Sequence, residues 1–509
     1  MDRRKFLRQL GLLASASTMS MTMGSVPLRA FGKSIYKADE LNGKVLVLIQ
    51  LSGGNDGLNT VIPFEDSLYY NARPNIAINK SDVIKLNPLT GLHPSMEPFK
   101  QFYDEGKLAI VQNVGYPSHN RSHFRSTDIW LSGSDSDEYL SDGWVGRYLG
   151  NSLTNDPNYN LDHPMAISLG STQDSLLSCT CQSGSLGISF EDPNQFFQLI
   201  NGSSADTDPP PNTIAGNQLK YVKEIAARSI KYAEIIKEKA DTIDNQTNYP
   251  NTDLADQLSI IAQLVAGGLE TPVYLTSIGG FDTHSNQLGR HASLLDNVSQ
   301  SLSAFQRDLE LLGVADRVVT MTFSEFGRTV EQNGSGGTDH GAAAPLFVLG
   351  KNVNGGIWGG NPDLTDLDGS GDNKFKYDFR QVYATMLRDQ LGAGPDDMEN
   401  ILFKDFDTLP LVSVKHITSG GPRAFELNQN YPNPFNPRTK ISYTLRLPQV
   451  ISLKVFDSTG RLVKTLFSGH KDAGTFTETF GGNEYPSGIY YCHLVSGSYR
   501  KTIKMTLLK

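Results

Sequence analysis

The stretch Val45–Phe64, VLVLIQLSGGNDGLNTVIPF, places seven mostly apolar residues and one serine before Gly-Gly-Asn-Asp-Gly. A short apolar run that ends at glycines is typical of a strand buried on both faces of a parallel sheet. Glycines let the backbone turn tightly and let another group approach it closely. We therefore expect the strand to end at the edge of a sheet and to present Asp56 there. A simple turn and a backbone nest that binds phosphate are the alternatives for the same glycines.

The region from 41 to 411 repeats this pattern of an apolar strand that runs into a polar loop. Further strands are predicted at 108–114 and in PVYLTSI, RVVTMTF and APLFVLG, and apolar residues at helical spacing predict helices at 217–240, 253–269, 287–313 and 378–392. This alternation predicts an α/β domain with a mostly parallel sheet sandwiched by helices. In such sheets, ligands bind beyond the carboxyl ends of the strands.

Carboxylates and histidines gather in the loops next to these strands. Asp282 and His284 follow PVYLTSI, and Asp339 and His340 precede APLFVLG. Together with Asp56 they offer the oxygen and nitrogen donors that suit zinc or manganese better than calcium. Each motif alone is also consistent with a solvated surface loop. Their placement next to successive strands predicts a divalent metal site.

Three further residues are candidates for catalysis. Ser122 lies in HNRSHFRSTDIW near a predicted helix start, where an anionic group is favoured. It either acts as the nucleophile or caps the helix, and a water whose pKa a bound cation lowers is the alternative attacker. In SEFGRT, Arg328 is expected to clamp a phosphate or sulfate oxygen. Glu325 would be a further metal ligand or hold Arg328, and a local ion pair between the two is the alternative.

The composition excludes some classes of protein. The chain has 509 residues, a net charge of −9 and 38% hydrophobic residues, which indicates a globular protein of more than one domain. The mildly acidic composition does not suggest a basic surface of the kind that binds nucleic acid. Three cysteines provide no disulfide framework.

Residues 1–30 are expected to be an export signal. They combine a basic start, a weakly apolar middle and small residues near the end. The middle is too short and too polar for a stable transmembrane span. The run from Arg3 to Leu7, RRKFL, resembles a twin-arginine signal and implies the twin-arginine translocase as a partner. A general secretory signal is the alternative.

The chain beyond residue 411 forms a separate module. Residues 412–424 are linker-like, and 425–509 contain short alternating segments broken by Gly, Pro and Asn, which predict an antiparallel β-sandwich. YPNPFNP, VFDSTGRLVKTL and SGIYYCHL resemble the C-terminal sorting domain of the type IX secretion system. This resemblance implies the type IX machinery as a partner, with passage through the periplasm to the cell surface or the extracellular space.

The central region resembles the family of domain of unknown function 1501. The resemblance rests on LSGGNDGLNTVIPF, NRSHFRSTDIW, GGFDTHSNQ, TFSEFGRT, GTDHG and DFRQVYATML. That family is similar to the alkaline phosphatase and sulfatase superfamily. The resemblance therefore implies an alkaline phosphatase-like fold and a two-metal site, and it implies a partner from the family of domain of unknown function 1800.

The superfamily pattern can be carried onto this chain residue by residue. Asp56 matches the first Asp, Asp282 and His284 the middle pair, Asp339-His340 the later pair, and Ser122 the nucleophile by order alone. Superfamily phosphatases use a further His, yet no His lies between His340 and His416. Either Asp378 or Arg380 replaces it, or one metal position is missing.

Two functions follow as expectations. The first is an exported, metal-dependent hydrolase of phosphate or sulfate esters. The alternative is a non-catalytic cell-surface protein that keeps the fold and binds a glycan, a phosphorylated polymer or a protein.

Overall fold

The computed structural model describes residues 21–23, 26–30, 43–151, 163–170, 174–179, 184–185, 187–190, 230–413, 426–445, 449–471, 474–481, 483–496 and 499–509. The chain divides into two compact units, Met1–Val414 and Lys415–Lys509. Among the described residues, no helix combines the length and the apolar character needed to cross a bilayer.

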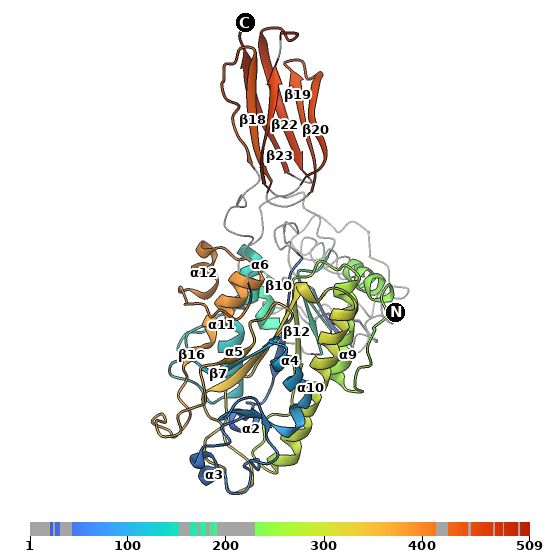
Figure 1. Ribbon diagram of the computed structural model, residues 1–509. Helices are drawn as coiled ribbons and strands as arrows, with labels where there is room; N and C mark the ends of the chain where they lie inside the picture. The colour runs from blue at the N-terminus through green and yellow to red at the C-terminus, as the bar shows by residue number, and fades with distance from the viewer. Residues whose placement is uncertain are drawn as a thin grey trace, which may run out of the picture. The chain divides into compact units, whose positions relative to one another are not determined.

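The first unit is built on one large sheet (Figure 1). Its strands, in spatial order, are β1 (Met21–Met23), β2 (Val26–Ala30), β11 (Ile188–Phe190), β8 (Ala166–Leu169), β12 (Val273–Ile278), β3 (Val45–Leu51), β13 (Val318–Phe323), β14 (Ala344–Leu349), β7 (Leu108–Gly115) and β15 (Gly356–Trp358), and β16 (Tyr377–Asp378) also pairs with β7. Two small sheets, β4 (Val61–Ile62) with β6 (Gly91–Leu92) and β5 (Ile84–Lys85), and β9 (Ser178–Cys179) with β10 (Gly184–Ser185), lie outside it.

The sheet is mostly parallel, as the sequence predicts. Strands β11, β8, β12, β3 and β13 run parallel to one another. Strand β14 is antiparallel to both β13 and β7, so β7 again points the same way as β13. The carboxyl ends of β12, β3, β13 and β7 therefore lie at one edge of the sheet. The start of β14 lies there too, because Ala344 pairs with Val114 near the end of β7.

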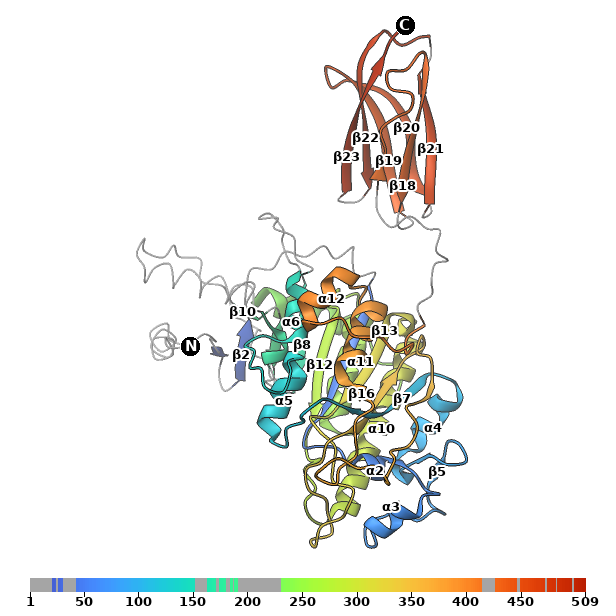
Figure 2. The ribbon, with the colours of Figure 1, turned by 90° about the vertical axis from the view of Figure 1, so that its left-hand side faces the viewer.

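Helices cover both faces of the sheet (Figures 1 and 2). They are α2 (Gly57–Thr60), α3 (Ser67–Ala72), α4 (Glu97–Asp104), α5 (His123–Ser132), α6 (Trp144–Asn151), α9 (Asp253–Ala266), α10 (Gln287–Leu311), α11 (Phe379–Thr385) and α12 (Pro395–Leu402), with a π-helical turn η6 (Met386–Gln390), the 3-10 turns η2 (Pro94–Met96), η3 (Asp174–Leu177) and η5 (Ala315–Arg317), and a helix at 230–241. The helix predicted from 217 is described only from residue 230 onward.

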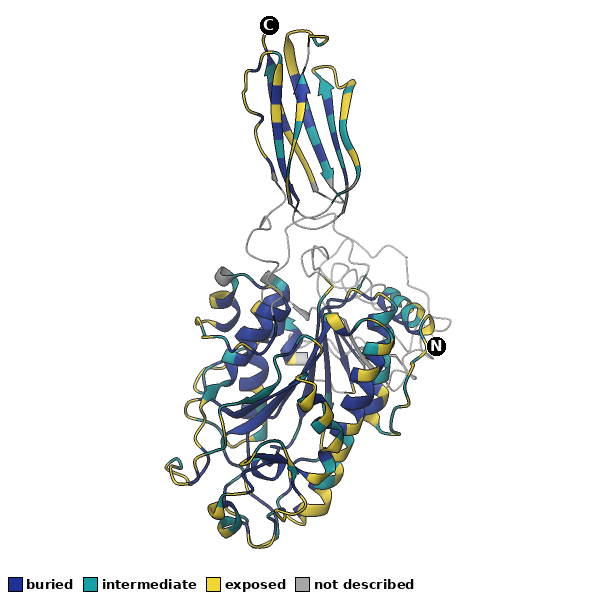
Figure 3. Cartoon of the chain, in the orientation of Figure 1, coloured by how far each residue is buried: buried dark blue, intermediate teal, exposed yellow. Residues whose placement is uncertain are grey.

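Strand β3 contributes to a hydrophobic core on each face of the sheet. Val45, Val47 and Ile49 pack with α4, α9 and α10, whereas Leu46 and Leu48 pack with α5, α6, α11 and α12. Every residue of β3 is buried, and the strands in the middle of the sheet are dark blue in Figure 3. Burial on both faces explains why its sequence is continuously apolar instead of alternating.

A buried ion pair follows directly after β3. Asp56 caps the short helix α2, and Arg73 Nη1 donates to both of its carboxylate oxygens at 2.9 and 2.7 Å. Both side chains are fully buried. The carboxylate also accepts from the side chain of Gln287 and from the backbone N–H of Asn59. Burial alone would raise the pKa of Asp56, but Arg73 and the other partners outweigh it and lower that pKa.

The second unit is an antiparallel β-sandwich, which confirms the predicted architecture of the tail. One sheet contains β17 (Glu426–Leu427), β18 (Arg438–Leu445) and β21 (Gly474–Gly481), and the other contains β20 (Leu462–Lys471), β19 (Gln449–Asp457), β22 (Gly488–Ser496) and β23 (Tyr499–Leu507). Residues from both sheets, including Ile441, Tyr443, Leu453 and Leu494, form its core.

Within the expected export signal, strands β1 and β2 are described, and β2 pairs with β11 at the edge of the large sheet. The twin-arginine motif at Arg3 and Arg4 lies outside the described residues.

Replacing Arg73 with Met should strongly destabilise the first unit, because it leaves the Asp56 carboxylate buried without its counter-charge. We expect a loss of about 3–5 kcal/mol in the free energy of unfolding, measured by urea denaturation. Lys80→Met is the matched control, since Lys80 pairs with Glu65 at the surface and such pairs contribute about 0–1 kcal/mol. Equal losses in the two variants would contradict the structural role of the buried pair.

Candidate metal centre

Three imidazole rings and one carboxylate converge at the edge of the sheet. The Nε2 atoms of His284, His340 and His123 lie 3.0, 3.3 and 3.5 Å from Asp282 Oδ1. The Nε2 atoms of His284 and His340 are 2.9 Å apart. The side chains of Asp282 and His284 are 45% and 44% exposed, so the cluster is open to a ligand from solvent.

The ends of three strands and the start of a fourth position this cluster. His123 is the first residue of α5, in the segment that follows β7. Asp282 and His284 follow β12, and His340 lies shortly before β14. An isolated antiparallel bridge joins His340 to Arg328, which follows β13. The location agrees with the expectation that the site lies beyond the carboxyl ends of the parallel strands.

The other ring nitrogen of each histidine is held by an acceptor. Nδ1 of His123 lies 2.8 Å from Glu325 Oε1, and Nδ1 of His284 lies 2.8 Å from Asp339 Oδ1. Nδ1 of His340 lies 2.7 Å from the carbonyl oxygen of Arg121. A carboxylate or carbonyl accepts only from a protonated nitrogen, so these partners place a proton on each Nδ1. In a neutral ring, Nε2 then carries a lone pair that faces the centre of the cluster.

The carboxylate at the centre is ionised. Burial would raise the pKa of Asp282, but a hydrogen bond from Arg328 and the charges of Arg328 and the histidines lower it to about 2. The hydrogen bond to Glu325 raises the pKa of His123, whereas burial lowers the pKa of His340. When the three rings are neutral, three nitrogen lone pairs and one negative oxygen face one another, and a cation among them would relieve their repulsion.

These residues fit a bound divalent cation. His123, Asp282 and His340 each offer a ligand atom within 4.8 Å of the others, and His284 Nε2 lies beside them. His123 Nε2 is buried without a hydrogen-bond partner among the described residues, which fits a nitrogen that serves as a metal ligand. A metal-ligating histidine usually donates its second N–H to a carboxylate or carbonyl, and all three rings do so. Nitrogen with carboxylate oxygen suits zinc or manganese.

Of the five predicted metal ligands, the structure brings Asp282, His284 and His340 together. Asp339 lies beside them, but it binds His284 Nδ1 and also accepts from Asn333 at 3.2 Å. We therefore assign it an outer role that orients His284.

Asp56 does not join the cluster, contrary to the sequence-based expectation. Arg73, Gln287 and the N–H of Asn59 occupy the acceptor positions of its buried carboxylate. These partners leave no position for a metal ion.

Arg328 also has a different environment from the one predicted. Its side chain is fully buried, and its guanidinium donates to Asp282 Oδ1 at 2.6 Å and to the backbone carbonyls of Gly53, Gly54, Phe281 and Thr338. This environment speaks against a clamp on a substrate oxygen, because every N–H-bearing atom already donates within the protein. Arg328 instead holds Asp282 in place.

Glu325 is 1% exposed, and its carboxylate bridges a backbone N–H and a histidine ring. Its Oε1 accepts from the backbone N–H of Gly53 at 2.8 Å and from His123 Nδ1. It neither pairs with Arg328 nor faces the centre of the cluster. Glu325 therefore orients the ring of His123.

Ser122 is exposed and precedes His123 at the start of α5, and its side chain makes no capping hydrogen bond. The hydroxyl is therefore not used as a helix cap.

Asp378 and Arg380, the candidates to replace the missing superfamily histidine, bind other groups. Asp378 caps α11 and pairs with Arg380, which also pairs with Asp135.

His123 was not predicted as a ligand, because its spacing from the other histidines and carboxylates matches no metal-binding motif. The available signal was its position, since it follows the carboxyl end of β7 as Asp282 follows that of β12.

The glycines after β3 are required by the close approach of the loops that carry the site. Gly53 has φ +122°, and a Cβ there would lie 2.3 Å from the backbone nitrogen of Asp282. Gly54 has φ +79°, and its Cβ would lie 2.4 Å from the ring of Phe326. The glycines thus let the end of β3 pack against the loops that follow β12 and β13.

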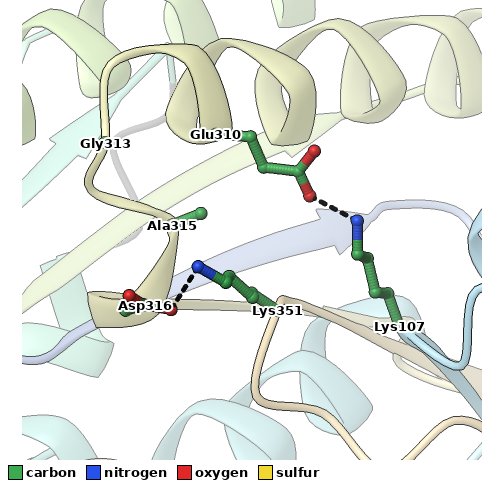
Figure 4. A pocket seen from close by; sticks show the side chains of 6 residues that line it. All are labelled: Lys107, Glu310, Gly313, Ala315, Asp316 and Lys351. Atoms are coloured by element: carbon green, nitrogen blue, oxygen red, sulfur yellow. Dashed lines mark hydrogen bonds and ion pairs between the residues drawn. The ribbon is translucent and has the colours of Figure 1, made fainter.

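A separate pocket lies at the opposite edge of the sheet (Figure 4). It is lined by Lys107, Glu310, Gly313, Ala315, Asp316 and Lys351. Both lysines are paired, Lys107 with Glu310 and Lys351 with Asp316, each at 2.8 Å. Lys107 precedes β7, so the pocket adjoins the amino ends of the parallel strands and is not part of the cluster.

Gly53→Ala should destabilise the first unit and displace Asp282, because the added methyl group meets its backbone and the left-handed backbone is strained. We expect a loss of about 1–3 kcal/mol in the free energy of unfolding from the strain alone. Gly279→Ala, at an exposed position where a Cβ meets nothing within 4 Å, should change it by less than about 0.5 kcal/mol. Indistinguishable urea unfolding midpoints for the two variants would refute this explanation of the glycines.

Comparisons with known proteins agree with the two resemblances in the sequence. Residues 233–398 match the family described as a protein of unknown function (DUF1501), and residues 429–508 match the secretion system C-terminal sorting domain. The first match includes Asp282, His284 and His340. A search of curated proteins gave no match.

Three solved structures are among those that the chain matches. A protein of the alkaline phosphatase superfamily from Vibrio parahaemolyticus is 10% identical, with 88% of this chain and 85% of that chain covered and a TM-score of 0.34. A Bacteroides thetaiotaomicron structure concerned with glycosaminoglycan metabolism is 8% identical, with 84% and 90% covered and a TM-score of 0.34. PorZ, a surface component of the type IX secretion system of Porphyromonas gingivalis, is 23% identical, with a TM-score of 0.13.

The match to PorZ covers 16% of this chain, which spans only 11% of the length of PorZ. The sorting domain indicates export to the cell surface or the extracellular space. The chain thus contains a region that matches the DUF1501 family model and a tail that matches the secretion system C-terminal sorting domain.

Proposed function

We propose that the first unit is a metal-dependent hydrolase of phosphate or sulfate esters that acts after export. The observation that carries the proposal is the convergence of three Nε2 atoms on the ionised Asp282 carboxylate. An arrangement of this kind is stabilised when a cation lies among the four groups.

In this proposal His123, His284, His340 and Asp282 hold one zinc or manganese ion. When bound, the cation supplies a Lewis acid that stabilises negative charge on an ester oxygen. Glu325, Asp339 and the Arg121 carbonyl keep the proton of each ring on Nδ1, which leaves Nε2 free as the ligand atom. Arg328 fixes the Asp282 carboxylate from the buried side.

Ser122 is the proposed nucleophile. It is exposed beside His123, and its hydroxyl does not cap α5. Its Oγ would attack the phosphorus or sulfur while the bond to the alcohol oxygen breaks, and the alcohol leaves with a proton. Water would then cleave the ester on Ser122, restoring the hydroxyl and releasing phosphate or sulfate.

One observation favours the alternative of a non-catalytic binding protein. A two-metal phosphatase would use Asp56 as a ligand and an accessible arginine, yet Asp56 pairs with Arg73 and Arg328 is enclosed by backbone carbonyls. A protein with a single cation can bind an anionic glycan or phosphorylated polymer without turning it over. Passage through the twin-arginine translocase and association with a DUF1800 protein also remain proposals.

The test combines metal content with turnover in the purified full chain. We expect about one equivalent of zinc or manganese at the cluster, and hydrolysis of at least one of three probes, an aryl phosphate, a bis-aryl phosphodiester and an aryl sulfate. His284→Ala should lose this equivalent and the activity. Glu325→Gln should retain the ligands but weaken metal affinity about 10–100-fold, because it only orients His123.

His493→Ala, in the second unit, is the control for the loss of an imidazole and should leave both measurements unchanged. Ser122→Ala should keep the metal and lose turnover. Bound metal with no turnover of any probe would support the binding protein instead, and unchanged metal content in His284→Ala would reject the site.

A further inference from the structure

A second group of ligand-type side chains lies near the first. His119 Nε2 is 3.8 Å from Asp368 Oδ2 and 3.9 Å from Asp372 Oδ2. One ligand atom from each residue lies within 4.8 Å of the other two. His119 belongs to the segment between β7 and α5, whereas the two carboxylates come from the loop between β15 and β16.

The carboxylate of Asp372 is an unusual group to bury. Its side chain is fully buried, and its Oδ1 has no hydrogen-bond partner among the described residues. Arg121 pairs with the other oxygen, Oδ2. The neighbouring Asn373 likewise has a buried Oδ1 without a partner. An unpaired buried oxygen costs about 1–3 kcal/mol, so a native protein normally provides such an atom with a water or an ion.

The loop is shaped so that Asp368 turns one oxygen toward His119. Its Oδ1 accepts from the backbone N–H groups of Ser370 and Asp372, at 2.8 and 2.9 Å. Oδ2 is the atom that lies beside His119. Gly371 has φ +82°, which allows the tight turn between the two aspartates.

We propose that His119, Asp368 and Asp372 form a second divalent cation site, specific for a transition metal such as manganese or zinc. One imidazole nitrogen with two carboxylate oxygens is a donor set for these ions and not for calcium, which takes oxygen ligands. The run from Asp366 has the beginning of a calcium loop, with acidic or hydroxyl residues at alternate positions and a glycine at the sixth. However, Asp366 pairs with Lys374, and the twelfth position is Tyr377 instead of Glu.

This site goes beyond the proposed hydrolase and does not depend on it. The two clusters are linked by Arg121, whose side chain pairs with Asp372 and whose carbonyl accepts from His340 Nδ1. A cation in the second site would fix the loop at 366–378 against the segment that carries Ser122 and His123.

The experiment uses the full chain with the first centre disabled by His123→Ala and His284→Ala. Titration calorimetry with MnCl₂, ZnCl₂ and CaCl₂ then reports the second site alone. We expect about one equivalent of manganese or zinc to bind and to raise the thermal unfolding midpoint. Adding Asp368→Asn or His119→Ala to this background should abolish both effects, while Asp363→Asn should leave them unchanged. Asp363 is an exposed aspartate near the same loop that bonds only locally, to Thr365.

Loss of binding in Asp368→Asn and His119→Ala, but not in Asp363→Asn, supports the second site. No binding of any cation in the background variant overturns it and leaves an ordered water at Asp372. Binding of calcium alone overturns the assignment to a transition metal. Because the first centre is absent throughout, these results do not depend on whether the protein hydrolyses esters.

Discussion

The guanidinium of Arg328 is the contact on which the candidate site depends. It is fully buried and donates to backbone carbonyls in three loops, which lie after β3, after β12 and before His340. It also donates to the carboxylate of Asp282. One charged group thus fixes loops that are distant in sequence. Hydrogen bonds to a charged group contribute about 1.5–3 kcal/mol each, and an unpaired buried charge is costly. The arrangement therefore favours one position for Asp282, around which the three imidazoles gather.

Each residue in the cluster has either an inner or an outer role. His123, His284, His340 and Asp282 face the centre, whereas Glu325 and Asp339 bind the far nitrogen of a ring. The outer carboxylates set the tautomer and orientation of the rings. This division explains why so many carboxylates accumulate in the loops although few of them face the centre.

The sequence predicted the fold well because burial of a strand on both faces leaves a clear pattern. The runs that became β3, β7, β12 and β13 were all identified, and the polar loops after them were expected at one edge. The antiparallel direction of β14 was not predicted, because an apolar run carries no information about direction. The division between inner and outer groups could not be predicted either. The amino-acid sequence does not reveal which groups become buried partners, such as Arg73 for Asp56 or the Gly53 N–H for Glu325.

The most direct test is an X-ray crystal structure of the metal-loaded protein with anomalous data collected at the zinc and manganese edges. We predict a peak about 2.0–2.2 Å from Nε2 of His123, His284 and His340 and from the carboxylate of Asp282. A fully loaded protein with no peak among these four side chains, or with its peak at the Asp56 carboxylate, would contradict it.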